Sequence, residues 1–277
     1  MMTSPARRFT NCLRYIFTLL LTGTVLAAQS ELDQRLIEPV PDATDEASRK
    51  IITTHLKAVG GERAIARVWS VRMQLDITTR KVPTQMEMAV MRPDSFYIKL
   101  ETERKGEPVL ITSGFDGEQA WIYDQSQKNA FPRETERESI RSEFEQPIVT
   151  PLYGWDERPD IYEYLGPVKS NGRECYLVKA YSPEGLTTYY YFDAKTLLLT
   201  REGRRELIKD IVVDRDNHVT AYENIDGLWM PTVMEQHMND EKIGTIKMTS
   251  IELNPSDLDL RLFSVPVVEE RWLRQSP

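Results

Sequence analysis

The sequence predicts a mainly β (α+β) protein, in which one large antiparallel sheet curls into an incomplete β-barrel covered by a few helices. Three observations predict this fold. Segments of alternating apolar and polar residues recur along the chain, turn-forming dipeptides separate them, and only two longer segments have helical character. Alternation with period two gives each strand one apolar face. A sheet of about a dozen antiparallel strands has to curl or close.

The stretch Gly185–Glu202 contains the clearest hairpin. Thr187–Phe192 is rich in β-branched and aromatic residues, which favour a strand. Asp193–Thr196 follows as a four-residue connection that begins with a turn-forming aspartate, and Leu197–Arg201 is the second strand. Asp-Gly pairs between apolar runs occur at two further places and indicate further hairpins.

Five strands are expected in the first half of the chain, at residues 71–77, 85–90, 96–101, 109–112 and 119–123. Their apolar side chains share one face of the sheet. So little helix is available to cover this concave face that we expect it to enclose an apolar cavity that binds lipid. The expected lipid-binding residues are Met73, Leu75, Ile77, Met86, Met88, Val90, Phe96, Ile98 and Leu100.

Methionine is frequent in the predicted sheet. Its flexible, polarizable side chain suits surfaces that adapt to varied apolar ligands, although the methionines taken alone favour ordinary core packing. The methionines in question are Met73, Met86, Met88, Met91, Met230, Met234, Met238 and Met248.

Helices are expected in three places. The first begins at Asp42 as its N-cap and ends at Val59, before a Gly-Gly pair. A short helical turn at Glu62–Arg67 follows, and a charged, helix-permitting segment lies within residues 131–148. Eight further strands complete one continuous sheet. They are expected at residues 161–165, 174–182, 187–192, 197–201, 208–214, 219–224, 233–237 and 242–253. Asp214 and Asp216 resemble a cation-binding loop only faintly, and Asp214–Asn217 is equally a hairpin turn.

The chain is divided into a signal peptide at residues 1–28, a flexible leader at residues 29–41 and one domain at residues 42–277. Arg7, Arg8 and Arg14 precede a short apolar run that ends in small residues, which is typical of an exported protein. An uncleaved membrane anchor is the alternative, but the run is shorter than the roughly 20 residues needed to span a bilayer. Cys12 precedes the run, so no lipid anchor is expected. These features predict a periplasmic protein.

Composition and motifs argue against several functions. The net charge is −8 and no basic stripe is present, so nucleic acid is not an expected partner. His55, His218 and His237 are far apart in sequence, and no nucleophile elbow or phosphate-binding loop occurs. We therefore expect no enzyme, with no catalytic residue, metal or cofactor. Cys175 is expected to be a buried free thiol.

The sequence resembles the LolA/LolB-like superfamily, in particular the outer-membrane lipoprotein-sorting type. Five segments carry the resemblance in this order: IITTHLKAVGGERAIARVWSVRMQLDI, FDGEQAWIY, LGPVKSNGRECYLVKAYSPEGLTTYYYFDAKTLLLTR, AYENIDGLWMPTVMEQ and LDLRLFSVP. The resemblance implies an incomplete β-barrel closed by helices, a lipid-binding concave face and no catalytic residues. The implied partners are lipid or lipoprotein acyl chains, with envelope membrane proteins as further candidates, and a monomer is expected.

Two hypotheses follow. The first is a periplasmic binding protein that buries the acyl chains of lipidic or lipid-modified cargo, in outer-membrane lipoprotein sorting or lipid trafficking. The second is an envelope sensor or scaffold that carries no cargo and whose sheet binds another protein.

Overall fold

A computed structural model describes residues 40–79, 82–126, 133–135, 149–183, 185–208 and 211–267. The predicted signal peptide, most of the predicted leader and most of the charged segment at residues 131–148 lie outside the described residues.

Helix α2 (Glu46–Val59) begins at Asp45 and not at Asp42 as predicted. The Asp45 carboxylate accepts hydrogen bonds from the backbone N–H of Ser48 and from that of Tyr164, each at 2.7 Å. The cap therefore also ties the helix to strand β7 (Ile161–Ser170), and this tertiary contact decides between two residues that could cap the helix. Gly60 ends the helix as predicted, with φ 143°. The short helix α3 (Glu62–Ala66) follows. Within the described part of the chain, no helix is both long and apolar enough to cross a membrane.

The predicted antiparallel sheet is confirmed. Thirteen strands form it in the order β6-β5-β4-β3-β2-β1-β13-β12-β11-β10-β9-β8-β7. Their bounds are β1 Ser70–Thr79, β2 Val82–Met91, β3 Ser95–Arg104, β4 Glu107–Phe115, β5 Ala120–Asp124, β6 Arg133–Thr135, β7 Ile161–Ser170, β8 Arg173–Tyr181, β9 Thr187–Asp193, β10 Leu199–Ile208, β11 Ile211–Ile225, β12 Leu228–Met238 and β13 Glu241–Leu253.

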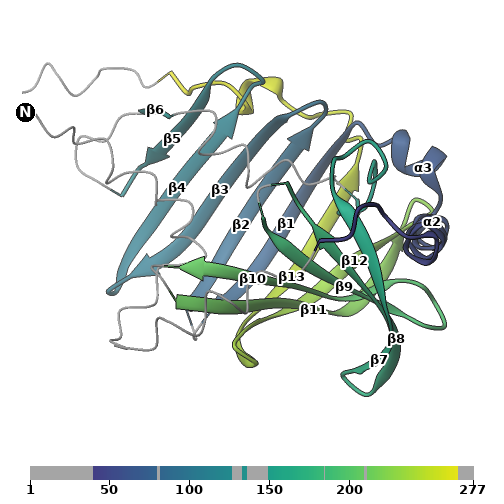
Figure 1. Ribbon diagram of the computed structural model, residues 1–277. Helices are drawn as coiled ribbons and strands as arrows, with labels where there is room; N and C mark the ends of the chain where they lie inside the picture. Colours follow the sequence, from purple (N-terminus) through teal and green to yellow (C-terminus); the bar gives the residue numbers. More distant parts are fainter. Residues whose placement is uncertain are drawn as a thin grey trace, which may run out of the picture.

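The sheet is strongly curled and not closed. Strands β6 and β7 are its two edges and do not pair with each other. Strands β9, β10 and β11 cross in front of β1 and β13, and α2 lies at one end of the curl (Figure 1). This is the curled sheet with few helices that the sequence predicts.

Strand β11 corrects the predicted turn at Asp214–Asn217. These residues lie inside one continuous strand of 15 residues. Asp214 and Asp216 form ion pairs with Arg205 and Arg201 on the neighbouring strand, so turn-forming side chains are held in the ladder instead. The charged segment at residues 131–148 also departs from the helix prediction at its start, because Arg133–Thr135 forms β6 and pairs with β5.

Apolar side chains cover both faces of the first half of the sheet. On the inner face, which packs against α2, the larger cluster includes Ile52 and Leu56 of the helix. On the outer face, the segment after β13 contributes Phe263, which packs with Trp121. The Trp121 Nε1 donates a hydrogen bond to the Phe263 carbonyl at 2.7 Å. The inner face, which is the concave side of the curled sheet, is therefore the candidate site.

Candidate functional site

The nine predicted lipid-binding residues all lie in the inner-face cluster. Met73 of β1 is directly opposite Met88 of β2, which is opposite Ile98 of β3, so the three strands present these side chains in one row. Seven of the nine are buried, whereas Met88 and Val90 are half-buried and pack against the others. The structure thus brings the predicted residues together, and it shows them as the apolar wall of the curl.

The apolar wall extends across the sheet to strands that the prediction did not include. Ile246 of β13 pairs with Ile77, and Met234 of β12 pairs with Ile246. Val178 and Phe192 face the same cluster from the second half of the sheet. Six of the eight methionines named in the sequence take part: Met73, Met86, Met88, Met230, Met234 and Met248. Methionine side chains are flexible and polarizable, so they fill the irregular spaces of this wall.

One end of the inner face is charged. Tyr190 belongs to the inner cluster, and its register partner on β10 is Glu202. Arg204 donates a hydrogen bond from Nη2 to the Glu202 carboxylate at 2.9 Å, and it lies directly opposite Arg215 of β11. Burial, followed by the charge of Glu202, raises the pKa of Tyr190 and keeps it neutral. The inner face is therefore amphipathic, apolar over β1–β3 and charged over β10 and β11.

Helix α2 is fixed against this face by His55. The ring is buried, with Nδ1 2.8 Å from the Leu197 carbonyl and Nε2 2.9 Å from the Thr150 hydroxyl. A carbonyl can only accept, so Nδ1 carries the proton and Nε2 accepts from Thr150. Phe192 meets the ring edge to face at 5.2 Å between centroids. The histidine is a structural clamp, and burial lowers its pKa to about 4.

Comparison with known proteins supports this architecture. No family model matches the sequence, and no curated protein matches it. Solved structures do match. A DUF1329 family protein from Desulfovibrio piger aligns with a TM-score of 0.53 and 13% identity, over 79% of this chain and 98% of that one. A putative outer membrane lipoprotein-sorting protein domain from Vibrio parahaemolyticus aligns with a TM-score of 0.51 and 8% identity, over 78% of this chain and 97% of that one. The fold is LolA-like.

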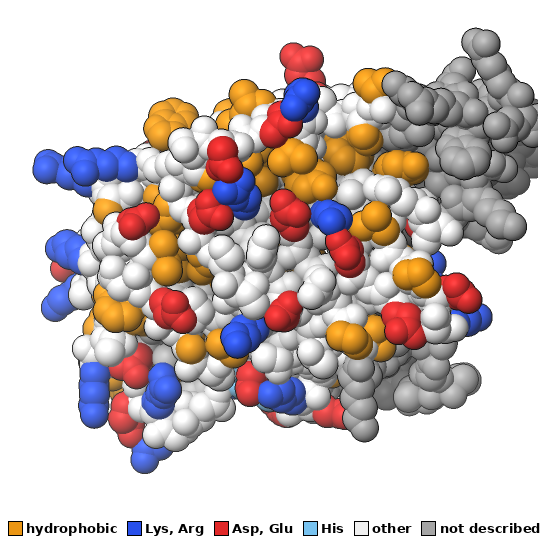
Figure 2. Space-filling view, turned by 180° about the vertical axis from the view of Figure 1, so that it is seen from behind, with side chains coloured by type: hydrophobic (Ala, Val, Ile, Leu, Met, Phe, Trp, Pro, Cys, Tyr) orange, Lys and Arg blue, Asp and Glu red, His pale blue; other side chains and the backbone are white. Residues whose placement is uncertain are grey.

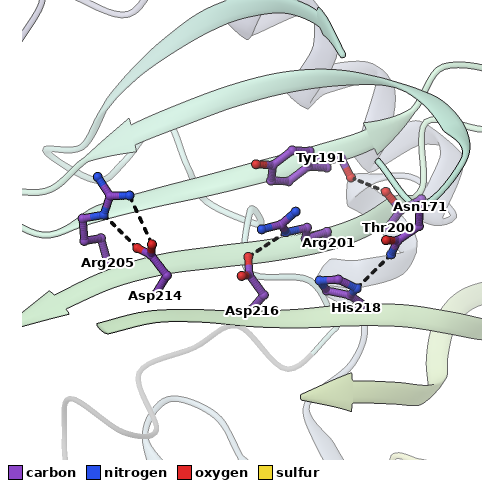
Figure 3. Close-up of polar contacts among 8 residues, drawn as sticks. All are labelled: Asn171, Tyr191, Thr200, Arg201, Arg205, Asp214, Asp216 and His218. Atoms are coloured by element: carbon purple, nitrogen blue, oxygen red, sulfur yellow. Dashed lines mark hydrogen bonds and ion pairs between the residues drawn. The ribbon is translucent and has the colours of Figure 1, made fainter. Parts of the chain in front are cut away.

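The outer face of this LolA-like sheet carries a ladder of ion pairs between β10 and β11 (Figure 3). Arg201 binds Asp216 at 2.6 Å and Arg205 binds Asp214 at 2.7 Å. The Arg201 guanidinium also lies 4.8 Å from the centre of the Tyr191 ring. Since each residue pairs across β10 and β11, the ladder stabilises the second half of the sheet and leaves its charges neutralised.

Gly203 leaves room for this ladder. A Cβ at Gly203 would approach the Asp216 carboxylate to 2.5 Å, so a side chain here would displace the ion pair.

Lys179 lies on the same face, buried between the rings of Tyr181 and Tyr189, with its Nζ 4.5 and 5.5 Å from their centres. Burial, followed by the charge of Arg205, lowers the pKa of Lys179.

Two of the three histidines meet on the outer face. His218 of β11 and His237 of β12 stack with centroids 4.1 Å apart, and Asn171 contacts Nδ1 of His218 at 2.8 Å. His55 lies elsewhere, and the described residues contain no group of three His, Cys, Asp or Glu side chains arranged to hold a metal ion.

Cys175 is a buried free thiol, as predicted. A separate depression of about 270 Å³ on the outer face is lined mainly by polar side chains, including Gln74, Gln85 and Lys99.

Proposed function

We propose that this protein is a periplasmic binding protein for lipidic or lipid-modified cargo, and that it buries acyl chains against the inner face of its sheet. The observation that carries the proposal is the apolar wall of the inner face that runs from β3 across β2, β1 and β13 to β12, with six methionines in it.

The energetics favour such a role. Each methylene group of an acyl chain gains about 0.8 kcal/mol on burial, so one chain supplies substantial affinity without specific polar contacts. Met88 and Val90 belong to the wall but are only half-buried, so their side chains leave apolar surface that a ligand would contact. The charged end of the inner face, at Glu202 and Arg204, lies where the polar part of an amphiphile would come to rest.

Export and non-catalytic action are parts of the same proposal. The arginines that precede a short apolar run and small residues at the start of the chain are typical of a cleaved signal peptide. The Vibrio protein with the same fold is described as a putative lipoprotein-sorting domain, and we infer a related role in lipoprotein sorting or lipid trafficking. The buried charges of the described sheet are engaged in ion pairs and ring contacts, which suits a carrier better than an enzyme.

A charge placed on the apolar wall tests the proposal. Met88→Asp adds a carboxylate at the half-buried centre of the wall, between Met73 and Ile98. If ligand and water reach this position, the variant folds, because the carboxylate stays hydrated, but it no longer binds acyl chains. Gln85→Asp is the matched control, because it adds the same charge on the exposed outer face of the same strand.

The measurement is a titration of delipidated mature protein with a fluorescent fatty-acid probe, together with circular dichroism of each variant. Wild type and Gln85→Asp should bind the probe with saturation, and Met88→Asp should remain folded and bind none. A flat titration of folded wild-type protein contradicts the proposal. Native mass spectrometry of protein purified from its own envelope distinguishes the alternative, since a sensor or scaffold would carry a stoichiometric protein partner and no lipid.

A further inference from the structure

Two tryptophans are exposed at the end of the molecule where α2 meets α3. Trp69 precedes β1 with 64% of its surface exposed, and Trp229 near the start of β12 has 42% exposed. Asn254 accepts a hydrogen bond from the Trp69 backbone N–H at 2.7 Å, which holds the residue at this end of β1. Leu228, the neighbour of Trp229, lies so close to Gly60 that a Cβ there would meet its Cδ2 at 2.6 Å. Both tryptophans therefore belong to segments that meet α2 and α3.

The two helices at this end carry an excess of basic residues in a protein whose net charge is −8. Helices α2 and α3 carry two exposed acidic residues, Glu46 and Glu62, while Asp45 is engaged as the N-cap. Their exposed basic residues, with the residue that caps α3, are Arg49, Lys50, Lys57, Arg63 and Arg67. Seen from behind, Lys and Arg side chains gather at the end that carries α2 and α3 (Figure 2).

We propose that this end, formed by Trp69, Trp229 and the exposed sides of α2 and α3, docks on the surface of an anionic lipid bilayer. Tryptophan side chains prefer the interface between lipid headgroups and acyl chains. Lysine and arginine are attracted to anionic headgroups within a Debye length of the surface. The acidic remainder of the protein is repelled by the same surface, so the charge asymmetry orients the molecule with this end toward the lipid. The inference does not depend on the proposed cargo, because it requires no occupied inner face.

Vesicle flotation of the mature protein tests the basic contribution. The protein should float with vesicles of phosphatidylcholine and phosphatidylglycerol in equal parts, should stay behind with pure phosphatidylcholine, and should be released by salt. Each basic residue near an anionic surface contributes about fivefold to the affinity, so Lys50→Glu, Lys57→Glu and Arg63→Glu together should weaken binding about a hundredfold or more. The matched control reverses the charge of three exposed residues elsewhere, Arg104 on β3, Lys105 in the β3–β4 turn and Lys247 on β13, by substitution to Glu. This control variant should bind like wild type.

Quenching by lipids with brominated acyl chains tests the tryptophans. Wild-type fluorescence should fall on binding, because Trp69 and Trp229 enter the interface. The double variant Trp69→Phe, Trp229→Phe should still float, because phenylalanine remains apolar, but should lose that quenching. Retained quenching in the double variant overturns the proposal, since another surface would then contact the lipid. Three other results also overturn the proposal: equal binding to neutral and anionic vesicles, equal weakening of binding by the control variant, and no flotation of the wild-type protein. Binding of a protein partner at this end would not rescue the proposal if the protein does not float.

Discussion

Acidification is expected to destabilise the protein through His55. The ring is only 1% exposed, and burial lowers its pKa from an ordinary value of 6.5 to about 4. Both ring nitrogens are used in the neutral form, because Nδ1 contacts the Leu197 carbonyl and Nε2 the Thr150 hydroxyl. A second proton on Nε2 removes the acceptor that Thr150 uses and buries a charge between α2 and β9.

The sign and size of the effect follow from the two pKa values. Between about pH 6.5 and pH 4, His55 binds a proton in the unfolded chain but not in the folded one. The free energy of unfolding is therefore highest above pH 6.5 and falls as the pH falls toward 4. The full shift is worth about 3 kcal/mol, of which about 2 kcal/mol is lost by pH 5. That is a large share of the roughly 5–15 kcal/mol that stabilises a typical domain.

Urea unfolding at pH 7 and pH 5, followed by tryptophan fluorescence, measures this loss. His55→Gln keeps one donor and one acceptor but does not titrate, so its stability should fall by about 2 kcal/mol less than that of wild type over the same interval. Burial and the neighbouring His237 lower the pKa of His218 as well, but that pair is present in both proteins and cancels in the difference. Equal losses in the two proteins would refute the assignment of the acid sensitivity to His55.

Two substitutions test the packing of the sheet, with urea unfolding as the assay for both. Gly60→Ala should cost about 3 kcal/mol, because φ is 143° and the new Cβ would meet Leu228 at 2.6 Å. Gly61→Ala is strained as well, because φ is 89°, but it has open space around it and should therefore cost less than Gly60→Ala. Equal losses would contradict the close contact between Gly60 and Leu228. Arg201→Met should cost about 3 kcal/mol by leaving the buried Asp216 carboxylate without its ion-pair partner. Adding Asp216→Ala should recover most of that loss, and no recovery would show that Arg201 acts through packing alone.

Much of the fold could be predicted because its signals are local. Alternation located the strands, and Gly60 marked the end of α2. Two of the errors came from residues whose role is decided by distant partners. Asp42 and Asp45 are equally able to cap a helix, and Asp45 is used because its carboxylate also binds the Tyr164 backbone. The Asp214–Asn217 segment has the composition of a turn, but arginines on β10 hold it extended.

The candidate site was partly predictable for the same reason. All nine predicted positions face inward because β1, β2 and β3 alternate strictly. The charged end of the inner face was not predicted. Strand β10 carries charged residues on both faces, so its sequence does not reveal that Glu202 points inward and Arg201 outward. That choice depends on pairing with Tyr190, whose ring belongs to the core.

The two halves of the sheet are stabilised in different ways, and the difference bears on how cargo would be held. On β10 and β11, a slip of one residue would turn Arg201 inward and leave Asp216 without its partner, so the ion pairs lock the register of the second half. On β1–β3 the inner face is apolar and rich in methionine, and its packing tolerates rearrangement better than paired charges do. A register-locked half opposite an adaptable apolar half suits a protein that encloses acyl chains of varied shape. Met88 lies in this adaptable half, at the half-buried centre of the wall, so the Met88→Asp variant tests whether acyl chains bind there.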